Sequence, residues 1–88
     1  MRTDGAREAI RSELRSFILE DVLQGSARDL SWRAPLLSGV LDSLGLIHLL
    51  AFLEERFGVA VDYADVVDGN FGSLDRLAEY VERSRDHR

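Results

Sequence analysis

The residue with the clearest chemical potential in this chain is Ser43, a hydroxyl placed directly after an aspartate at the start of a predicted helix over residues 42–57. Asp42 is a favourable N-cap, because its carboxylate can accept a hydrogen bond from a backbone N–H of the first helical turn. Gly58 is expected to end the helix, since the left-handed conformation of a C′ residue is easiest for glycine. Ser43 therefore stands at the positive end of the helix dipole, where a phosphodiester on its oxygen would be stabilised.

Nucleophilic catalysis is the other chemistry open to a serine, and it needs a base within hydrogen-bonding reach. His48 is the nearest histidine in sequence, but it lies about 140° around the helix from Ser43 at ~100° per residue, so it cannot face the hydroxyl. His87 belongs to the C-terminal tail. The sequence therefore favours a serine that is modified over one that catalyses, and we expect a protein without enzyme activity.

The acidic residues Asp62, Asp65 and Asp68 raise the question of a calcium site. A calcium loop needs oxygen ligands at alternate positions and a distal glutamate, whereas these carboxylates recur at every third residue. The chain also contains no cysteine, which excludes disulfides and thiolate metal sites and favours a cytoplasmic location. We expect no metal ion.

The net charge of −5 over 88 residues is unevenly distributed. Residues 34–82 contain nine acidic side chains against two arginines, a balance of −7. An acidic body disfavours nucleic acids and favours partners with basic surfaces. No apolar run approaches the length of a membrane span, so a membrane partner is not expected either.

Helical periodicity and capping residues predict an all-α fold, a small bundle of three main helices and one short helix. The predicted helices are residues 6–23, 42–57, the short 63–67 after the cap Asp62, and a last helix that begins after Ser73. Residues 59–61 are expected to be an extended linker and residues 68–70 a turn. We expect a single domain over residues 1–88, with residues 1–5 and 84–88 disordered.

A long connection over residues 24–41 joins the first two helices. Trp32 is expected to pack against the first helix, and the Leu36-Leu37 pair to fill the bundle. The remaining core is predicted from helical spacing to be Leu14, Phe17, Ile18, Leu46, Leu50, Leu53, Phe57, Val61, Leu74, Leu77 and Val81.

The second helix separates two faces. Its apolar face carries Leu46, Leu49, Leu50, Leu53 and Phe57, and its opposite face carries Leu44, His48, Ala51 and Glu55. The opposite face is expected to be exposed next to Ser43.

The segment from Gly39 to Leu44 and the Leu-Glu-Glu-Arg-Phe-Gly run that ends at Gly58 resemble the modification-site region of acyl and peptidyl carrier proteins. Further on, the Asn-Phe-x-Ser-Leu run over residues 70–74 resembles the final segment of discrete carriers. The resemblance implies that Ser43 bears a covalent 4′-phosphopantetheine arm and that Asp42 helps the modifying transferase engage the serine. The thiol of the arm would hold an acyl or aminoacyl group as a thioester.

The resemblance also implies partners that meet the second and third helices. These are a phosphopantetheinyl transferase, an acyltransferase or adenylating ligase, and condensing or transferring enzymes. The residues expected to contact them are Leu44, Gly45, His48, Ala51, Glu55 and Tyr63. The carrier is expected to be a monomer.

The pathway stays open at this point. Fatty-acid carriers usually place an acidic residue where Gly45 stands, and acidic or other polar residues at the position of His48, so a housekeeping fatty-acid role is disfavoured. The differences resemble discrete polyketide and aminoacyl carriers more closely. Between these two we favour a discrete carrier of polyketide-type antibiotic biosynthesis, with an aminoacyl or peptidyl carrier of nonribosomal peptide biosynthesis as the alternative. An alternative of a different class is a helical docking module that never receives a prosthetic group.

Overall fold

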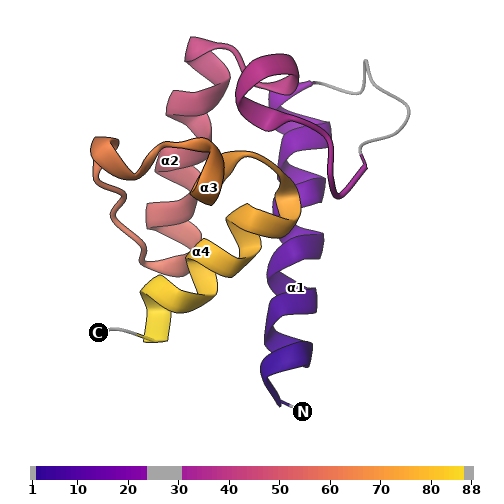
Figure 1. The fold of residues 1–88 in the computed structure, drawn as a ribbon, viewed down its shortest axis with the longest axis vertical. Coiled ribbons are helices and arrows are strands. Elements are labelled where there is room, and N and C mark those ends of the chain that lie inside the picture. The colour runs from indigo at the N-terminus through magenta and orange to yellow at the C-terminus, as the bar shows by residue number, and fades with distance from the viewer. Residues whose placement is uncertain (1, 24–30, 87–88) are drawn as a thin grey trace.

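The computed structural model describes residues 2–23 and 31–86, and all regular secondary structure within these ranges is helical (Figure 1). The elements in chain order are α1 (Arg2–Phe17), the π-helical segment η1 (Ile18–Val22), the π-helical segment η2 (Leu36–Val40), α2 (Ser43–Phe57), the 3₁₀ segment η3 (Tyr63–Asp65), α3 (Asp68–Phe71) and α4 (Leu74–Asp86). The all-α prediction is confirmed. None of these helices is long and apolar enough to cross a membrane.

The first predicted helix is one continuous rod made of α1 and η1. Ile10, Leu14 and Ile18 recur at every fourth position and are buried, so a single stripe faces the core. The rod closes with a widened turn in which the amide of Leu23 donates to the carbonyl of Ile18 at 2.8 Å. The helix begins at Arg2, four residues before the predicted start.

Helix α2 begins and ends as its local sequence predicts. Asp42 accepts a hydrogen bond from the amide of Gly45, and Gly58 adopts a left-handed φ of 70° while its amide donates to Glu54. The core face is rotated relative to the prediction, however. Leu49 and Leu53 are fully buried together with Gly45, whereas Leu46, Leu50 and Phe57 are half-buried. The rotation follows from the partner helix, because Phe52 stacks on Phe17 of α1 with ring centroids 4.2 Å apart.

The short third helix lies elsewhere than predicted. Asp62 caps a single 3₁₀ turn, with Ala64 donating to its carboxylate at 3.1 Å, but the helix ends at Asp65 instead of continuing to Val67. The α-helical turn is α3, where the sequence analysis placed a turn over residues 68–70. It forms because Phe71 is fully buried, and the Phe71 amide donates to the carbonyl of Val67 at 2.7 Å.

Helix α4 crosses the bundle and packs most extensively against α1 (Figure 1). Leu74, Leu77, Ala78 and Val81 are fully buried, and the hydroxyl of Ser73 accepts from the third amide along at 3.3 Å, as expected of a cap. The helix continues to Asp86. The last turn is held against the bundle by the Arg85 guanidinium, which lies 5.8 Å from the ring of Phe57.

The described part of the long connection, residues 31–41, is fixed to the bundle at several points. The Arg11 guanidinium lies 4.3 Å from the Trp32 ring centroid, so the predicted packing of Trp32 against the first helix is confirmed. Leu36 is fully buried, as predicted, and its amide donates to the carbonyl of Gly72 at 3.0 Å. Residues 24–30 of this connection, and the predicted disorder of Met1 and of residues 87–88, lie outside the described residues.

Candidate functional site

Ser43 is the first residue of α2 and is exposed. The capping carboxylate beside it is engaged, because Oδ1 of Asp42 accepts from the Gly45 amide at 2.7 Å. The carbonyl of Asp42 accepts the first intrahelical bond, from the Leu46 amide at 2.9 Å. Within residues 2–23 and 31–86, no acceptor is bonded to the amides of Ser43 and Leu44.

This arrangement fits a phosphodiester on the serine oxygen. A helix of 15 residues directs its dipole toward Ser43, and two first-turn N–H groups stand free beside the hydroxyl. The hydroxyl is open to an enzyme that must reach it, and the helix that carries it is anchored by Leu49 and Leu53. The residues present therefore suit a group that is attached through a phosphate and is free to move away from the bundle.

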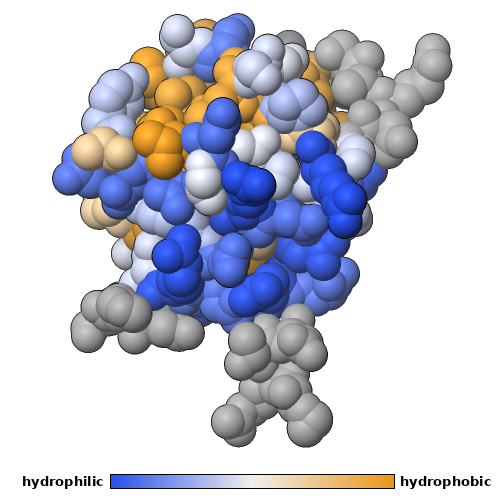
Figure 2. Space-filling view, viewed as in Figure 1, coloured by the Kyte–Doolittle hydropathy of each residue, from blue (hydrophilic) through white to orange (hydrophobic). Residues whose placement is uncertain are grey.

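The surface next to Ser43 is apolar. Leu44 is 61% exposed and Ile47 57% exposed, both unusually high for large aliphatic side chains. His48, Ala51 and Glu55 are exposed as well, so the four residues predicted for the outer face all point away from the core. Ile47 was not among the predicted partner residues, although its position four residues after Ser43 could have indicated it. In Figure 2, apolar residues gather on the upper part of the molecule, where α2 starts, while the lower part is hydrophilic.

Two predicted partner residues are placed apart from this face. Gly45 is buried: a Cβ atom on it would lie 2.9 Å from Cγ1 of Val22, so it faces η1 and not a partner. Tyr63 is 72% exposed but belongs to η3, near the half-exposed Val67, on a different element from Ser43.

The structure brings His48, Ala51 and Glu55 together with residues of the first rod. They line a groove of about 510 Å³ with Phe17, Glu20, Asp21 and Phe52. The sequence analysis placed Phe17 in the core and gave no role to Glu20 or Asp21. No sequence signal marks this groove, since it depends on how α1 and η1 lie against α2.

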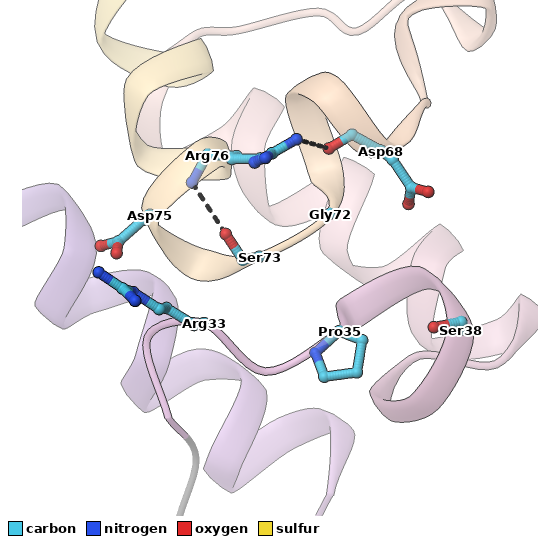
Figure 3. A pocket seen from close by; sticks show the side chains of 8 residues that line it. All are labelled: Arg33, Pro35, Ser38, Asp68, Gly72, Ser73, Asp75 and Arg76. Carbon is cyan, nitrogen blue, oxygen red and sulfur yellow. Dashed lines mark hydrogen bonds between the residues drawn. The ribbon is translucent and has the colours of Figure 1, made fainter.

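A second hollow, of about 540 Å³, lies where the long connection meets α3 and α4 (Figure 3). Its side chains are mostly polar, and they include the guanidinium of Arg76, which donates to the carbonyl of Asp68 at 3.3 Å. None of the predicted site residues lines it. Among the described residues, no group of three or more histidine or acidic side chains is arranged to hold a metal ion.

The structure is therefore a small helical bundle whose second main helix begins at an exposed serine. The family model for the phosphopantetheine attachment site matches residues 16–81. The chain therefore belongs to the carrier protein family, and its prosthetic group is a covalently attached 4′-phosphopantetheine. The family model confirms the predicted family and cofactor. Domains of this family generally carry that group without catalysing a reaction themselves.

Solved structures share the fold of this chain. Three solved chains match significantly. One of them, in a structure described as "Crystal structure of FAD-dependent dehydrogenase", is 35% identical with a TM-score of 0.72, and the match covers 77% of this chain and 97% of that chain. The search of curated proteins gave no significant match.

Proposed function

We propose that Ser43 is the modified residue and that the protein is an acyl carrier of polyketide-type natural-product biosynthesis. The observation that supports this is the exposed hydroxyl at the start of α2, beside two amides without a bonded acceptor among the described residues. When attached, the prosthetic group supplies a terminal thiol that holds an acyl group as a thioester. The chain's own part is to present Ser43, to stabilise the phosphate with the helix N-terminus, and to offer a surface to each enzyme in turn.

The decisive experiment measures the intact mass of the protein after incubation with coenzyme A and a broad-specificity phosphopantetheinyl transferase. We expect the gain of one phosphopantetheine group, abolished in Ser43→Ala. Ser38→Ala is the matched control, because Ser38 is also exposed and lies five residues upstream on η2. An unchanged mass in the parent protein, or modification that persists in Ser43→Ala, would refute the assignment. An unmodified protein would instead support a docking module without a prosthetic group.

Asp42 has two roles in this proposal, which one substitution can separate. Its Oδ1 caps α2, while its charge would help the transferase engage the serine. Asp42→Asn retains an oxygen that can accept from the Gly45 amide but removes the charge. We expect this variant to keep the stability of the parent and to be modified more slowly, whereas equal rates would assign Asp42 to capping alone.

Partner enzymes would meet the exposed residues that follow Ser43, namely Leu44, Ile47, His48, Ala51 and Glu55, with Tyr63 as a separate contact. Leu44 and Ile47 are aliphatic side chains without burial in the bundle, which suits short-lived docking through a small apolar patch. Gly45 has no place in this surface. The partners in view are the transferase, a loading acyltransferase or adenylating ligase, and condensing or transferring enzymes.

The cargo is the finer part of the proposal. The Gly45 and His48 positions disfavour a fatty-acid carrier and suit polyketide and aminoacyl carriers alike. We favour a polyketide-type acyl group, with an amino acid as the alternative; intact mass spectrometry of the protein from its native host decides between them. The description of the similar solved structure names an FAD-dependent dehydrogenase, so a flavoenzyme is the first client to test. Binding of such an enzyme should weaken in Leu44→Asp and stay unchanged in Asp68→Asn, which alters an exposed residue on α3.

A further inference from the structure

The groove between the first rod and α2 has an aromatic floor. Phe17 and Phe52 stack with ring centroids 4.2 Å apart and an interplanar angle of 13°, and Phe57 meets Phe52 edge-on at 5.8 Å. Phe17 and Phe52 are half-buried, so part of each ring faces the solvent. A neighbouring hollow of about 360 Å³ shares Phe17, Phe52, Glu20 and Asp21 with the first, and the two form one trough, here called the α1–α2 groove.

The rim of this groove is acidic and largely unpaired. Glu20 and Asp21 stand on η1, and Glu55 stands on α2; none has an ion pair or side-chain hydrogen bond within residues 2–23 and 31–86. The groove is therefore an apolar strip between carboxylates. Contact between water and the exposed ring surface is unfavourable, so an apolar partner side chain that covers the rings would bind favourably. The carboxylates favour partners that carry positive charge.

At one end of the α1–α2 groove, a carboxylate is already paired with an arginine of the same chain. The guanidinium of Arg56 on α2 reaches across to Glu13 on α1, and this carboxylate raises the pKa of Arg56. Because α1 and α2 run in opposite directions (Figure 1), the pair closes the end near the C-terminus of α2. Toward the start of α2 the groove is lined by Glu20, Asp21 and His48, and among the described residues that line it there is no arginine.

We infer that the α1–α2 groove is a docking site for a partner protein segment that presents arginine beside an apolar side chain. Arginine is favoured over lysine because its planar guanidinium can bond a carboxylate in bidentate fashion and also lie on an aromatic face. The apolar neighbour would cover Phe17 and Phe52, while the guanidinium would reach Glu20 and Asp21 or Glu55. The groove shares His48, Ala51 and Glu55 with the exposed face of α2, but it does not need a modified Ser43.

The test uses the full chain and a defined probe, a helical peptide with arginines four residues apart and leucines between them on the same face. Binding is followed by shifts of backbone amide NMR signals. We expect saturable shifts at Glu20, Asp21, Ala51 and Glu55, and a loss of affinity of about tenfold or more in the triple variant Glu20→Gln, Asp21→Asn, Glu55→Gln. Shifts confined to Leu44 and Ile47 would overturn the inference.

A charge-matched variant separates a specific groove from general attraction. Glu54→Gln, Asp68→Asn, Glu79→Gln removes the same charge from exposed carboxylates outside the groove. We expect it to bind the peptide within about twofold of the parent at moderate salt, because these three carboxylates do not line the groove and exposed charges that make no direct contact are weakened by salt. An equal loss of affinity in the two triple variants would overturn the inference. A second peptide, with lysines in place of the arginines, tests the choice of arginine, and equal binding of the two peptides would overturn that choice.

The outcome is independent of the modification experiment, because the apo protein and Ser43→Ala both retain the groove. If Ser43 proves unmodified while the peptide binds, the groove stands and the carrier proposal falls. If Ser43 is modified and the peptide does not bind, the carrier proposal stands and the inferred docking groove falls.

Discussion

Gly45 at the start of α2 and Val22 at the end of η1 approach so closely that a Cβ on Gly45 would lie 2.9 Å from Cγ1 of Val22. The same atom would lie 3.1 Å from Oδ1 of Asp42, the cap of the helix. The absence of a side chain therefore lets η1 and the first turn of α2 meet. Ser43 stands two residues before this contact, so its position relative to the bundle depends on it.

The first prediction follows from that contact. Gly45→Ala gains about 1 kcal/mol of helix propensity but must push aside a stiff β-branched side chain and the capping oxygen, at a cost of about 1–3 kcal/mol. We expect a net loss of about 1 kcal/mol in the free energy of unfolding, measured by urea denaturation. In a Val22→Ala background the same substitution should be neutral or stabilising, and an unchanged effect there would refute the contact as the cause.

The second prediction concerns the cap. Asp42→Ala removes the acceptor for the Gly45 amide and should lower the free energy of unfolding by about 1 kcal/mol. Asp62→Ala is the control, because Asp62 accepts from Ala64 in the same way but caps only the three residues of η3. It should cost less than Asp42→Ala in the same urea denaturation experiment. The reverse order would contradict the view that α2 depends on its cap.

The third prediction concerns pH. Burial, followed by the hydrogen bond to Asp65 and a smaller contribution from Asp62, raises the pKa of Tyr80, whose hydroxyl donates to Asp65 at 3.0 Å. Since the folded-state pKa lies above the ordinary value of 10.0, this stabilisation is complete below that pH and is lost as the pH rises through the folded pKa. We expect the protein to lose stability in this alkaline range.

Two variants make the pH prediction specific. Tyr80→Phe should lower stability by about 1 kcal/mol at neutral pH and should show less alkaline loss. Tyr63→Phe leaves Tyr80 as the sole tyrosine, so that tyrosinate absorbance follows the buried hydroxyl alone. A midpoint at or below pH 10.0 in that variant would contradict the raised pKa.

The fourth prediction concerns Arg11, which ties the long connection to the first rod. Its guanidinium lies 4.3 Å from the Trp32 ring, and its Nε lies 3.2 Å from the Asp75 carboxylate on α4. Arg11→Met keeps the aliphatic stem but removes both interactions, together with the ion pair to the exposed Glu8 at 3.2 Å, and we expect a loss of about 1–2 kcal/mol. Trp32 is the one tryptophan in the chain, so its fluorescence reports the change directly.

Arg33→Met is the control for that substitution. Arg33 is exposed, and its guanidinium has no ion pair or hydrogen bond in the parts of the chain that the structure describes. We expect a change within about 0.5 kcal/mol, the usual range for an exposed surface residue. An equal loss of unfolding free energy in Arg11→Met and Arg33→Met would mean that the contacts of Arg11 add nothing beyond the general effect of a positive charge.

The sequence alone determined the features that depend on short segments. The cap at Asp42, the stop at Gly58 and the exposed Ser43 between them follow from hydrogen bonds spanning three or four residues and from the conformational freedom of glycine. The resemblance to carrier proteins rests on the same local run, and the family model confirms the family over residues 16–81.

The tertiary structure decided which face each local element presents. Three outcomes depend on contacts with distant segments. Gly45 faces Val22 and not a partner, Phe17 lines the groove and does not fill the core, and the α-helical turn of the third helix starts at residue 68 and not at 63. Periodicity places apolar residues on one side of a helix, but several rotations of that helix bury a similar area. The choice among them is made by close packing, because only one rotation fits Phe52 against Phe17 and leaves room for Val22 beside Gly45.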